Sequence, residues 1–388
     1  MPSEIPPPAA PSASRLGLPM GLIGTIALIV AVESFVMKHD YDLTTLIASN
    51  WQIEGRAPAR HAASNEVLIF GDSMVKFGVQ PRVLKARLGK PAYNFALYCG
   101  SAPSSYFMLR RAFDAGAKPS AVVVDFQPEL LLCDSMTVLS RVYPELLTFR
   151  EAAELCWTAR DADRLAEFAV AKVLPSARKR HEIRAGILAA FKGESASVRD
   201  KLLAARRNWK VNKGAEVLPK NPHFHGEVPE VGAYPAMFWV PWQGNPVNLA
   251  FLDRFLELAG SRQVPVFWIL QPNAPKVDER REQVGYNAEF DRFIRSVQDR
   301  YPNLVVIDGR HVNYPHQVFI DPVHLDRQGA TAQSLGVADV LQAHLADPKA
   351  APRWVVLPDH RDRFDSIALE DNNESGIALK AEQEKTRR

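Results

Sequence analysis

The chain has 388 residues, of which 47% are hydrophobic and 23% are charged, as is usual for a globular protein. This composition excludes a largely disordered chain, a collagen-like chain and a membrane protein with many spans. The 47 Lys and Arg against 44 Asp and Glu give a net charge of +3, which is too small to indicate a nucleic-acid-binding protein. Three cysteines without a zinc-like spacing predict neither a disulfide framework nor a bound metal, and no motif indicates another cofactor.

An apolar run lies near the N-terminus. Residues 1–15 are rich in Pro, Ala and Ser and are expected to form a disordered lead. Leu16–Val32 is uncharged, and after Glu33 the apolar character continues to Met37, so a helix over 16–37 would span roughly 33 Å, about one hydrocarbon core. We predict a single-pass transmembrane anchor at 16–37; a cleaved signal peptide and a buried core helix are the alternatives. The short lead before a large domain favours a periplasmic or extracellular main domain.

The body of the chain alternates short apolar runs with helical patterns. Apolar runs without polar alternation indicate strands that are buried on both faces, and strands that alternate with helices predict a parallel, doubly wound sheet. We therefore predict an α/β fold over 62–345, a flavodoxin-like three-layer sandwich with a five-stranded parallel sheet. The expected strands are Glu66–Phe70, Pro91–Ala96, Ala121–Phe126, Val264–Leu270 and Leu304–Ile307, and the expected helices are 81–88, 104–115, 247–260, 286–300 and 327–345.

A long interruption at 134–245 separates the third and fourth expected strands. It is too long for a plain loop in a compact domain, so we predict a helical insertion or lid. Residues 160–213 hold 14 Lys and Arg against 6 Asp and Glu, an excess of +8. This basic block is either a solvated helical face or a surface that attracts an anionic polymer or lipid headgroups. Residues 346–388 are charged and have few large apolar side chains, so we expect a mostly disordered tail.

The strongest chemical signal is Gly71-Asp72-Ser73, directly after the first expected strand. A serine just past the carboxyl end of a strand can lie on a tight turn, with its hydroxyl raised above the sheet. A preceding glycine allows the backbone to turn closely. A nucleophilic hydroxyl needs a general base, which is usually histidine. The alternative is an ordinary Asp or Ser cap at a helix N-terminus.

A candidate base lies in Asp321-Pro-Val-His324, before the last expected helix. In a loop, Asp at i and His at i+3 can lie close together, and the carboxylate then holds the imidazole tautomer while the other ring nitrogen faces the serine. Asp308 and His311 have the same spacing, but Asp308 ends the fifth expected strand, where a polar residue often simply terminates an apolar run. We favour Asp321 and His324, because a position before the last helix allows them to reach over the sheet.

With these motifs the sequence resembles the SGNH/GDSL hydrolase superfamily, over 66–133 and 246–345. The family's markers are GDS after the first strand, an Asn…Gly segment after the second and DxxH before the last helix. The resemblance implies the SGNH hydrolase fold. It also implies that Ser73 is the nucleophile, His324 the base and Asp321 the acid that orients the base.

The second and third family blocks concern the oxyanion hole. Gly100, which follows the second strand, matches the second block, and the resemblance implies that its backbone N–H joins that of Ser73 in an oxyanion hole. The third block is usually Gly-x-Asn-Asp, whereas this chain reads Asp125-Phe-Gln-Pro-Glu129. The amide of Gln127 could donate in place of the missing asparagine, and Asn273, after the fourth strand, is the other candidate.

Two functions follow as hypotheses. The first is a membrane-anchored serine esterase or O-acyltransferase that acts on acyl esters, above all acetyl esters, through an acyl-serine. The layout also resembles that of membrane-linked proteins of polysaccharide O-acetylation, which implies an acylated envelope polysaccharide as substrate and a membrane acyl-transfer protein as a candidate partner. The second hypothesis is a catalytically inactive SGNH-fold component that binds or scaffolds a surface-polymer assembly, and the missing asparagine motivates it.

Overall fold

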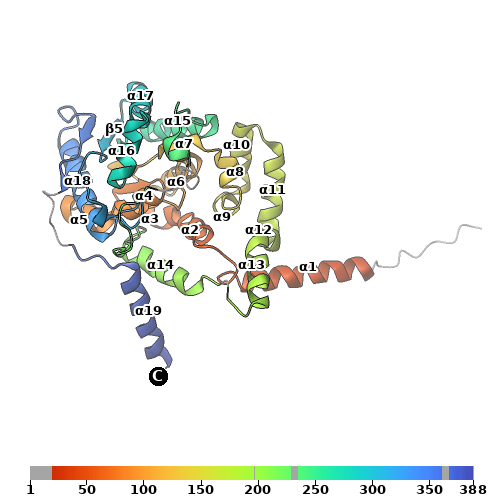
Figure 1. Cartoon of the computed structure of the whole chain (residues 1–388). Helices are drawn as coiled ribbons and strands as arrows, with labels where there is room; N and C mark the ends of the chain where they lie inside the picture. The colour runs from red at the N-terminus through yellow and green to blue at the C-terminus, as the bar shows by residue number, and fades with distance from the viewer. Residues whose placement is uncertain (1–19, 196, 229–234, 361–366, 388) are drawn as a thin grey trace, which may run out of the picture.

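A six-stranded sheet runs through the body of the protein, in a computed structural model that describes residues 20–195, 197–228, 235–360 and 367–387 (Figure 1). The expected lead at 1–15 and the first four residues of the expected anchor lie outside these residues. All strand pairs are parallel, in the order β2-β1-β3-β4-β5-β6. The strands are β1 Val67–Phe70, β2 Ala92–Asn94, β3 Ala121–Val124, β4 Val266–Leu270, β5 Leu304–Asp308 and β6 Trp354–Val356.

The prediction of an α/β fold with a parallel sheet is confirmed, but the predicted number of five strands is wrong. β6 lies in the expected tail and pairs with β5, with Trp354 opposite Val306. Its three residues are half-buried or exposed at the sheet edge. A strand this short, without a buried apolar run, leaves little periodicity for sequence analysis to detect. The tail contributes a helix as well, α19 Asn372–Arg387.

Helices cover both faces of the sheet because each central strand is buried on both sides. Leu68 and Phe70 of β1 belong to one apolar core, and Val67 and Ile69 belong to the other, as the alternation of side chains along a strand requires. The first core is completed by helices α6 Ala102–Asp114, α15 Pro246–Ser261 and α17 Tyr286–Arg300. The second core is completed by α4 Ser73–Gly78, α5 Pro81–Leu88 and α18 Arg327–Ala346.

The insertion between β3 and β4 is helical, as predicted, and its helices α8 to α13 lie at one side of the sheet (Figure 1). The insertion helices are α8 Ser135–Val138, α9 Tyr143–Leu146, α10 Phe149–Ala159, α11 Ala162–Val173, α12 Pro175–Arg178, α13 Arg180–Phe191 and α14 Arg199–Val211, followed by the 3₁₀ helix Pro235–Phe238. The remaining helices are α2 Leu46–Glu54, α3 Ala57–His61, the 3₁₀ helices Ala62–Ser64 and His316–Val318, α7 Pro128–Leu132 and α16 Pro275–Gln283.

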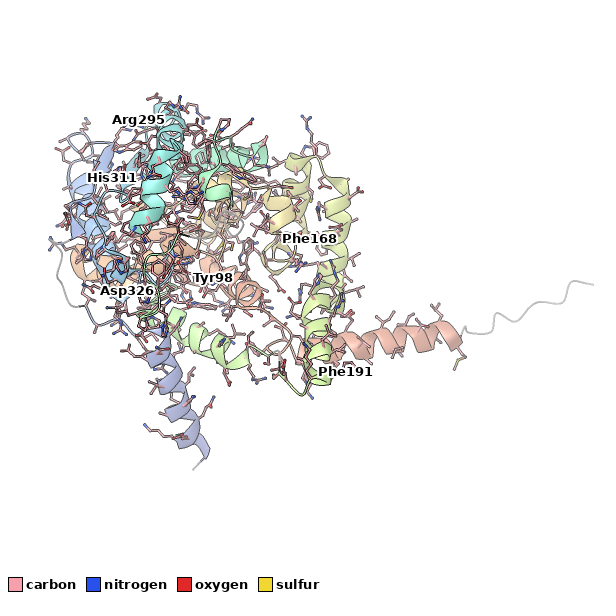
Figure 2. The ribbon with its side chains drawn as sticks, in the orientation of Figure 1. Tyr98, Phe168, Phe191, Arg295, His311 and Asp326 are labelled. Carbon is pink, nitrogen blue, oxygen red and sulfur yellow. The ribbon has the colours of Figure 1, made fainter. Side chains whose placement is uncertain are left out.

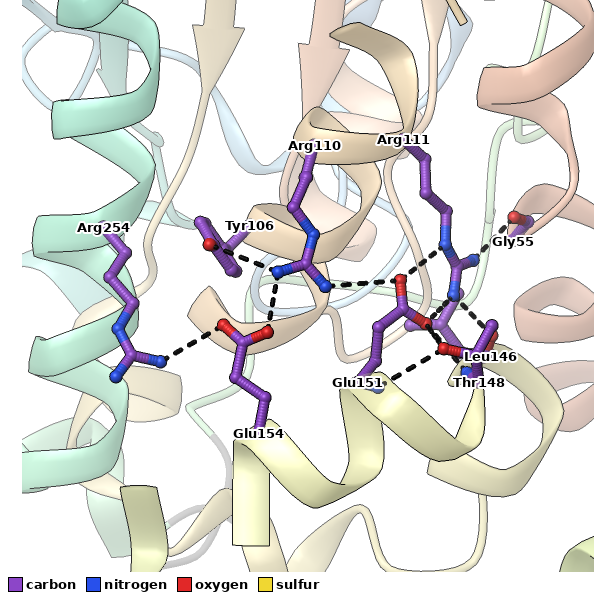
Figure 3. A network of polar contacts seen from close by, with 9 residues as sticks. All are labelled: Gly55, Tyr106, Arg110, Arg111, Leu146, Thr148, Glu151, Glu154 and Arg254. Carbon is purple, nitrogen blue, oxygen red and sulfur yellow. Dashed lines mark hydrogen bonds and ion pairs between the residues drawn. The ribbon is translucent and has the colours of Figure 1, made fainter. Parts of the chain in front are cut away.

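A polar network fixes the insertion to the sheet domain (Figure 3). The Arg111 guanidinium on α6 donates to the carbonyl oxygens of Gly55 and Leu146, each at 2.9 Å, and pairs with Glu151 on α10. Burial alone would raise the pKa of Glu151, but its hydrogen bonds and the charge of Arg111 hold that pKa below its usual value. Because Glu151 is buried and has several partners, this pair holds α10 more firmly than an exposed ion pair would.

The insertion closes against the other edge of the sheet at Gly214. The N–H of Asn94 on β2 donates to the carbonyl of Lys213 at 2.9 Å. The ammonium of Lys76, a fully buried residue on α4, donates to the carbonyl of Gly214 at 2.8 Å. The last helix of the insertion, α14, also packs on α19 of the tail. The insertion and the tail are therefore joined to the helix that Ser73 begins.

The N-terminal helix α1, Met20–Lys38, is long and apolar enough to cross a membrane. Its side chains are almost all exposed, and only Val36 is buried, which excludes the core-helix alternative. A membrane anchor and a signal sequence both fit its length, composition and position in the chain.

The contact at Gly214 generates a prediction about stability. Gly214 has a φ of +86°, and a Cβ there would lie 2.0 Å from the carbonyl oxygen of Asn94. Gly116 has a φ of +85° with no atom within 4 Å of its Cβ position, so Gly116→Ala measures the backbone strain alone, about 1–3 kcal/mol. We expect Gly214→Ala to lower the free energy of unfolding by about 1–3 kcal/mol more than Gly116→Ala, as measured by chemical denaturation. Equal losses would contradict a close approach of the insertion to β2.

Candidate active site

A tight turn at the end of β1 positions Ser73. Gly71 has a φ of +131°, and a Cβ there would lie 1.8 Å from Oδ1 of Asp125, so no other residue fits this turn. The Asp72 carboxylate accepts the Met74 N–H at 2.8 Å and caps α4, of which Ser73 is the first residue. The alternative interpretation of this motif, a helix cap, is therefore correct for Asp72, and the cap leaves the hydroxyl of Ser73 free for another partner.

The structure brings Ser73, His324 and Asp321 together in one hydrogen-bonded chain. Nε2 of His324 lies 2.8 Å from Oγ of Ser73, and Nδ1 of His324 lies 2.7 Å from Oδ2 of Asp321. The other carboxylate oxygen of Asp321 accepts the N–H groups of Val323 and His324, at 2.9 and 2.8 Å, an Asx turn that aspartate readily forms. The ring of Phe77 packs edge-on against His324, with centroids 4.9 Å apart.

The electrostatics of this chain suit proton transfer from Ser73. Burial alone would raise the pKa of Asp321, but the hydrogen bond and charge of His324 and the two backbone N–H groups hold that pKa below its usual value. An ionised Asp321 stabilises the proton on Nδ1 of His324, because a carboxylate can only accept. Nε2 is then left to accept the proton of the Ser73 hydroxyl.

The competing pair, Asp308 and His311, has a different role. The Asp308 carboxylate is held by the guanidinium of Arg310, with Nε at 2.9 Å and Nη2 at 2.6 Å. The same guanidinium lies 2.9 Å from Asp291. This pairing lowers the pKa of Asp308 although burial acts in the opposite direction. His311 is exposed, and Asp308 is paired with Arg310, so this DxxH pair makes no contact with Ser73 among the described residues.

Of the expected oxyanion donors, Gly100 belongs to a segment that packs beside the turn before Ser73, but its N–H is already bonded. The carbonyl of Gly71 accepts the Leu97 N–H at 3.0 Å, and a Cβ on Gly100 would lie 2.1 Å from that carbonyl oxygen. The segment that contains Gly100 thus packs directly against the turn before Ser73. However, the N–H of Gly100 donates to the carbonyl of Leu97 at 3.0 Å and closes a turn. Among the described residues, the Ser73 N–H has no hydrogen-bond acceptor.

The two amide side chains proposed for the third donor are both bonded to carboxylates. Nε2 of Gln127 donates to Oδ2 of Asp125 at 3.2 Å. Nδ2 of Asn273 donates to Oδ1 of Asp278 at 2.8 Å. Each amide NH2 has two hydrogens, so one donor of each amide is engaged by a carboxylate, and no hydrogen bond joins either amide to Ser73 among the described residues.

A polar network under Ser73 includes residues to which sequence analysis assigned no role in the site. Asp125 accepts the Asp72 N–H at 2.9 Å and, besides Gln127, Nε2 of Gln271 at 3.2 Å. Gln271 in turn accepts Nε2 of Gln333 at 2.5 Å. Asp125 and Gln271 each follow a strand directly, β3 and β4. Parallel strands end at the same edge of the sheet, so the position of these residues directly after strands was the sequence signal that could have placed them in the site.

The two aspartates at this edge share their environment. Asp72 and Asp125 are buried, and burial raises the pKa of both carboxyl groups. The proximity of Asp125 raises the pKa of Asp72 further. Two buried carboxyl groups so close are costly to ionise together, which is the physical cause of the raised pKa of Asp72. Among the described residues, no three His, Cys, Asp or Glu side chains form a group that could hold a metal ion.

Asp278 generates a prediction about pH. Loss of hydration raises its pKa from the ordinary value of 3.8 to about 7, although the hydrogen bonds from Asn273 act in the opposite direction. Between these two values the folded protein binds more protons than the unfolded chain, so stability falls as pH rises through this window. We expect the thermal unfolding midpoint of Asp278→Asn to fall less than that of the wild type between about pH 5 and pH 8. Parallel profiles would show that Asp278 does not titrate there.

Comparison of the sequence with known families and with curated proteins yields no matching family model and no similar curated protein. The grounds for a function are therefore the contacts of the site itself. They are the bonded chain of Ser73, His324 and Asp321, and the Ser73 N–H, which has no acceptor among the described residues.

Proposed function

We propose that the protein is a serine esterase or O-acyltransferase of the SGNH/GDSL type, with Ser73 as nucleophile, His324 as general base and Asp321 as the residue that orients His324. The observation that supports this proposal is the continuous hydrogen-bonded chain from Oγ of Ser73 to the carboxylate of Asp321, with contacts of 2.8 and 2.7 Å. A nucleophile, a base within hydrogen-bond reach and a third group that orients the base are the requirements for acyl transfer.

The reaction follows from these contacts. Oγ of Ser73 attacks the carbonyl carbon of an ester while Nε2 of His324 takes the hydroxyl proton, which gives a tetrahedral oxyanion. When this intermediate collapses, the carbon–oxygen bond to the alcohol breaks and His324 returns its proton to the leaving alkoxide. The acyl group remains on Ser73. Water then resolves the acyl-serine in a hydrolase, and a sugar hydroxyl resolves it in a transferase, by the same steps in reverse.

The oxyanion needs donors, and the order of the strands favours Gln127 over Asn273 for the side-chain donor. Ser73 follows β1, Gln127 follows the neighbouring strand β3, and Asn273 follows β4, one strand further away. Adjacent strands lie about 4.8 Å apart, so the amide of Gln127 has less distance to cover. Together with the free N–H of Ser73, a rotated Gln127 would supply two donors.

The contacts of α1 with the rest of the protein support a membrane-anchored location for the enzyme. Its Glu33 carboxylate accepts hydrogen bonds from the N–H and hydroxyl of Ser176 on α12, at 2.8 and 2.5 Å, and Val36 is buried against the protein. A helix with such contacts is part of the folded molecule, which favours a retained anchor over a cleaved signal sequence. An anchored enzyme outside the cytoplasm would meet acyl esters, acetyl esters above all, of an envelope polysaccharide. A membrane acyl-transfer protein is then a candidate partner.

The second candidate function is a catalytically inactive binding or scaffold component of a surface-polymer assembly. The observation that favours it is that three of the expected oxyanion donors are hydrogen-bonded to other acceptors. The N–H of Gly100 is bonded to Leu97, and the amides of Gln127 and Asn273 are bonded to Asp125 and Asp278. A purely binding domain, however, has no need for an aligned nucleophile, base and orienting acid.

Hydrolysis of p-nitrophenyl acetate by the full chain in detergent tests the two candidates. We expect Ser73→Ala and His324→Ala each to lower kcat by at least about 10³-fold, because either change removes the activated nucleophile. His311→Ala is the matched control, since this exposed histidine belongs to the other DxxH pair and should leave kcat unchanged. A fluorophosphonate probe should label Ser73 in the folded wild type. Equal rates for wild type and Ser73→Ala, with no label on Ser73, would favour the scaffold.

The choice of the third donor gives a separate prediction. We expect Gln127→Ala to lower kcat by about 10²-fold with little change in KM, because an oxyanion donor acts mainly in the transition state. Asn273→Ala is the comparison and should retain most of the activity. A larger loss in Asn273→Ala than in Gln127→Ala would reverse the assignment.

A further inference from the structure

Helix α13 has no buried side chain, although it is rich in apolar residues. Ile187, Leu188 and Phe191 have exposed fractions of 53%, 52% and 86%. A helix of this length is marginal in water unless tertiary packing covers its apolar side. Figure 2 shows Phe191 at the end of α13, near the point where α1 leaves the body. The apolar side of α13 therefore needs a cover that the described residues do not provide.

Helix α11, which precedes α12 and α13 in the chain, also has exposed apolar side chains. Val170 and Val173, which lie on one face of α11 at a spacing of three, have exposed fractions of 52% and 66%. We call these two residues, together with Ile187, Leu188 and Phe191, the outer apolar set. Scattered apolar side chains are normal on a soluble surface, but several of them on two helices of one segment, α11 and α13, are typical of an interface.

The position of α1 indicates what covers this set. Helix α12, which joins α11 to α13, holds the last turns of α1: Ser176 donates twice to Glu33, and Lys179 forms an ion pair with Asp40 just after the helix. The first turns of α1 project away from the body. The axes of α11 and α13 run roughly perpendicular to the axis of α1 (Figure 1). If the apolar run before Glu33 spans the hydrocarbon core, then Glu33 and its partner α12 lie at the membrane–water interface.

The charges beside the outer apolar set fit an anionic membrane surface. Arg180, Arg184 and Lys192 are exposed on or next to α13, and none forms a salt bridge with another described residue. By contrast, Arg178 on α12 is bonded to Glu145 at 3.1 Å. Basic side chains next to exposed Leu, Ile and Phe are typical of helices that lie in the interface of anionic bilayers.

We propose that helices α11 to α13 form a second membrane contact, which lies flat on an anionic phospholipid surface beside α1. The outer apolar set enters the boundary between headgroups and acyl chains, and Arg180, Arg184 and Lys192 bind anionic headgroups. Attachment at α1 and at this surface holds the sheet domain in one orientation relative to the membrane, because the Arg111 and Glu151 network ties the insertion to it. The proposal rests on the membrane anchor and is independent of the reaction at Ser73.

Photolabelling of the full chain in lipid nanodiscs tests this contact. The nanodiscs contain phosphatidylglycerol and a phosphatidylcholine with a diazirine in its acyl chain, and mass spectrometry maps the labelled peptides. We expect label on α1 and on the peptides that contain Val173 and Phe191. Helix α19 is the internal control, because its Ile377 is 69% exposed on a different part of the molecule and should stay unlabelled. Label confined to α1, or equal label on α19, would overturn the proposal.

A matched pair of variants separates the membrane contact from the fold. Leu188→Glu with Phe191→Glu should lower the label on α13 by at least about five-fold, while the label on α1 and the thermal unfolding midpoint stay as in the wild type. Ile377→Glu should change neither. Replacement of phosphatidylglycerol by a zwitterionic lipid should also lower the label on α13. If α13 is unlabelled in nanodiscs and becomes protected only when a membrane protein is added, the surface binds a protein partner and the lipid proposal fails.

Discussion

The lack of space between the end of β1 and the Asp125 carboxylate is the constraint on which the site depends. The turn at Gly71 leaves no room for a side chain, since a Cβ would lie 1.8 Å from that carboxylate. The same carboxylate accepts the Asp72 N–H, and Asp72 in turn caps the helix that Ser73 begins. One buried acid therefore sets the backbone path, the start of α4 and the position of the Ser73 hydroxyl. A buried carboxylate is costly unless it is hydrogen-bonded, and Gln271 supplies a further donor.

The outline of the fold and the hydrogen-bonded chain at Ser73 could be predicted because their signals are local. Continuous apolar runs mark strands buried on both faces, and the position of His324 before the last helix lets it reach Ser73. The details that were missed depend on tertiary contacts. Asp125 and Gln271 meet because β3 and β4 are neighbours in the sheet, and the N–H of Gly100 is taken by a carbonyl three residues earlier. Neither the order of these strands nor this hydrogen bond produces a periodicity or a composition that can be seen in the sequence.

The basic excess of the insertion divides into two kinds of charge. Some of these residues are used inside the molecule: Arg207 pairs with Glu370 of the tail, and Lys179 pairs with Asp40 after α1. Others, such as Arg184 on α13, lie exposed among apolar side chains. The net charge of the insertion therefore combines residues that hold the fold together with residues that lie free on its surface. Glu33 also has a structural use: it interrupts the apolar run in the sequence, and its carboxylate accepts a hydrogen bond from Ser176 in the fold.

In the proposed reaction, the hydrogen bonds of the two candidate amides also decide which amide can leave its partner to bind the oxyanion. Asp125 keeps the Asp72 N–H and the Gln271 amide if Gln127 rotates away, so the loss is one bond of 3.2 Å, about 1 kcal/mol. Asp278 accepts its side-chain hydrogen bond from Asn273 at 2.8 Å, and its raised pKa shows how poorly its charge is solvated there. Rotation of Asn273 would remove this shorter bond and leave the carboxyl with the backbone N–H of Asn273 at 3.4 Å. An oxyanion hole completed only when substrate binds is thus least costly if Gln127 moves.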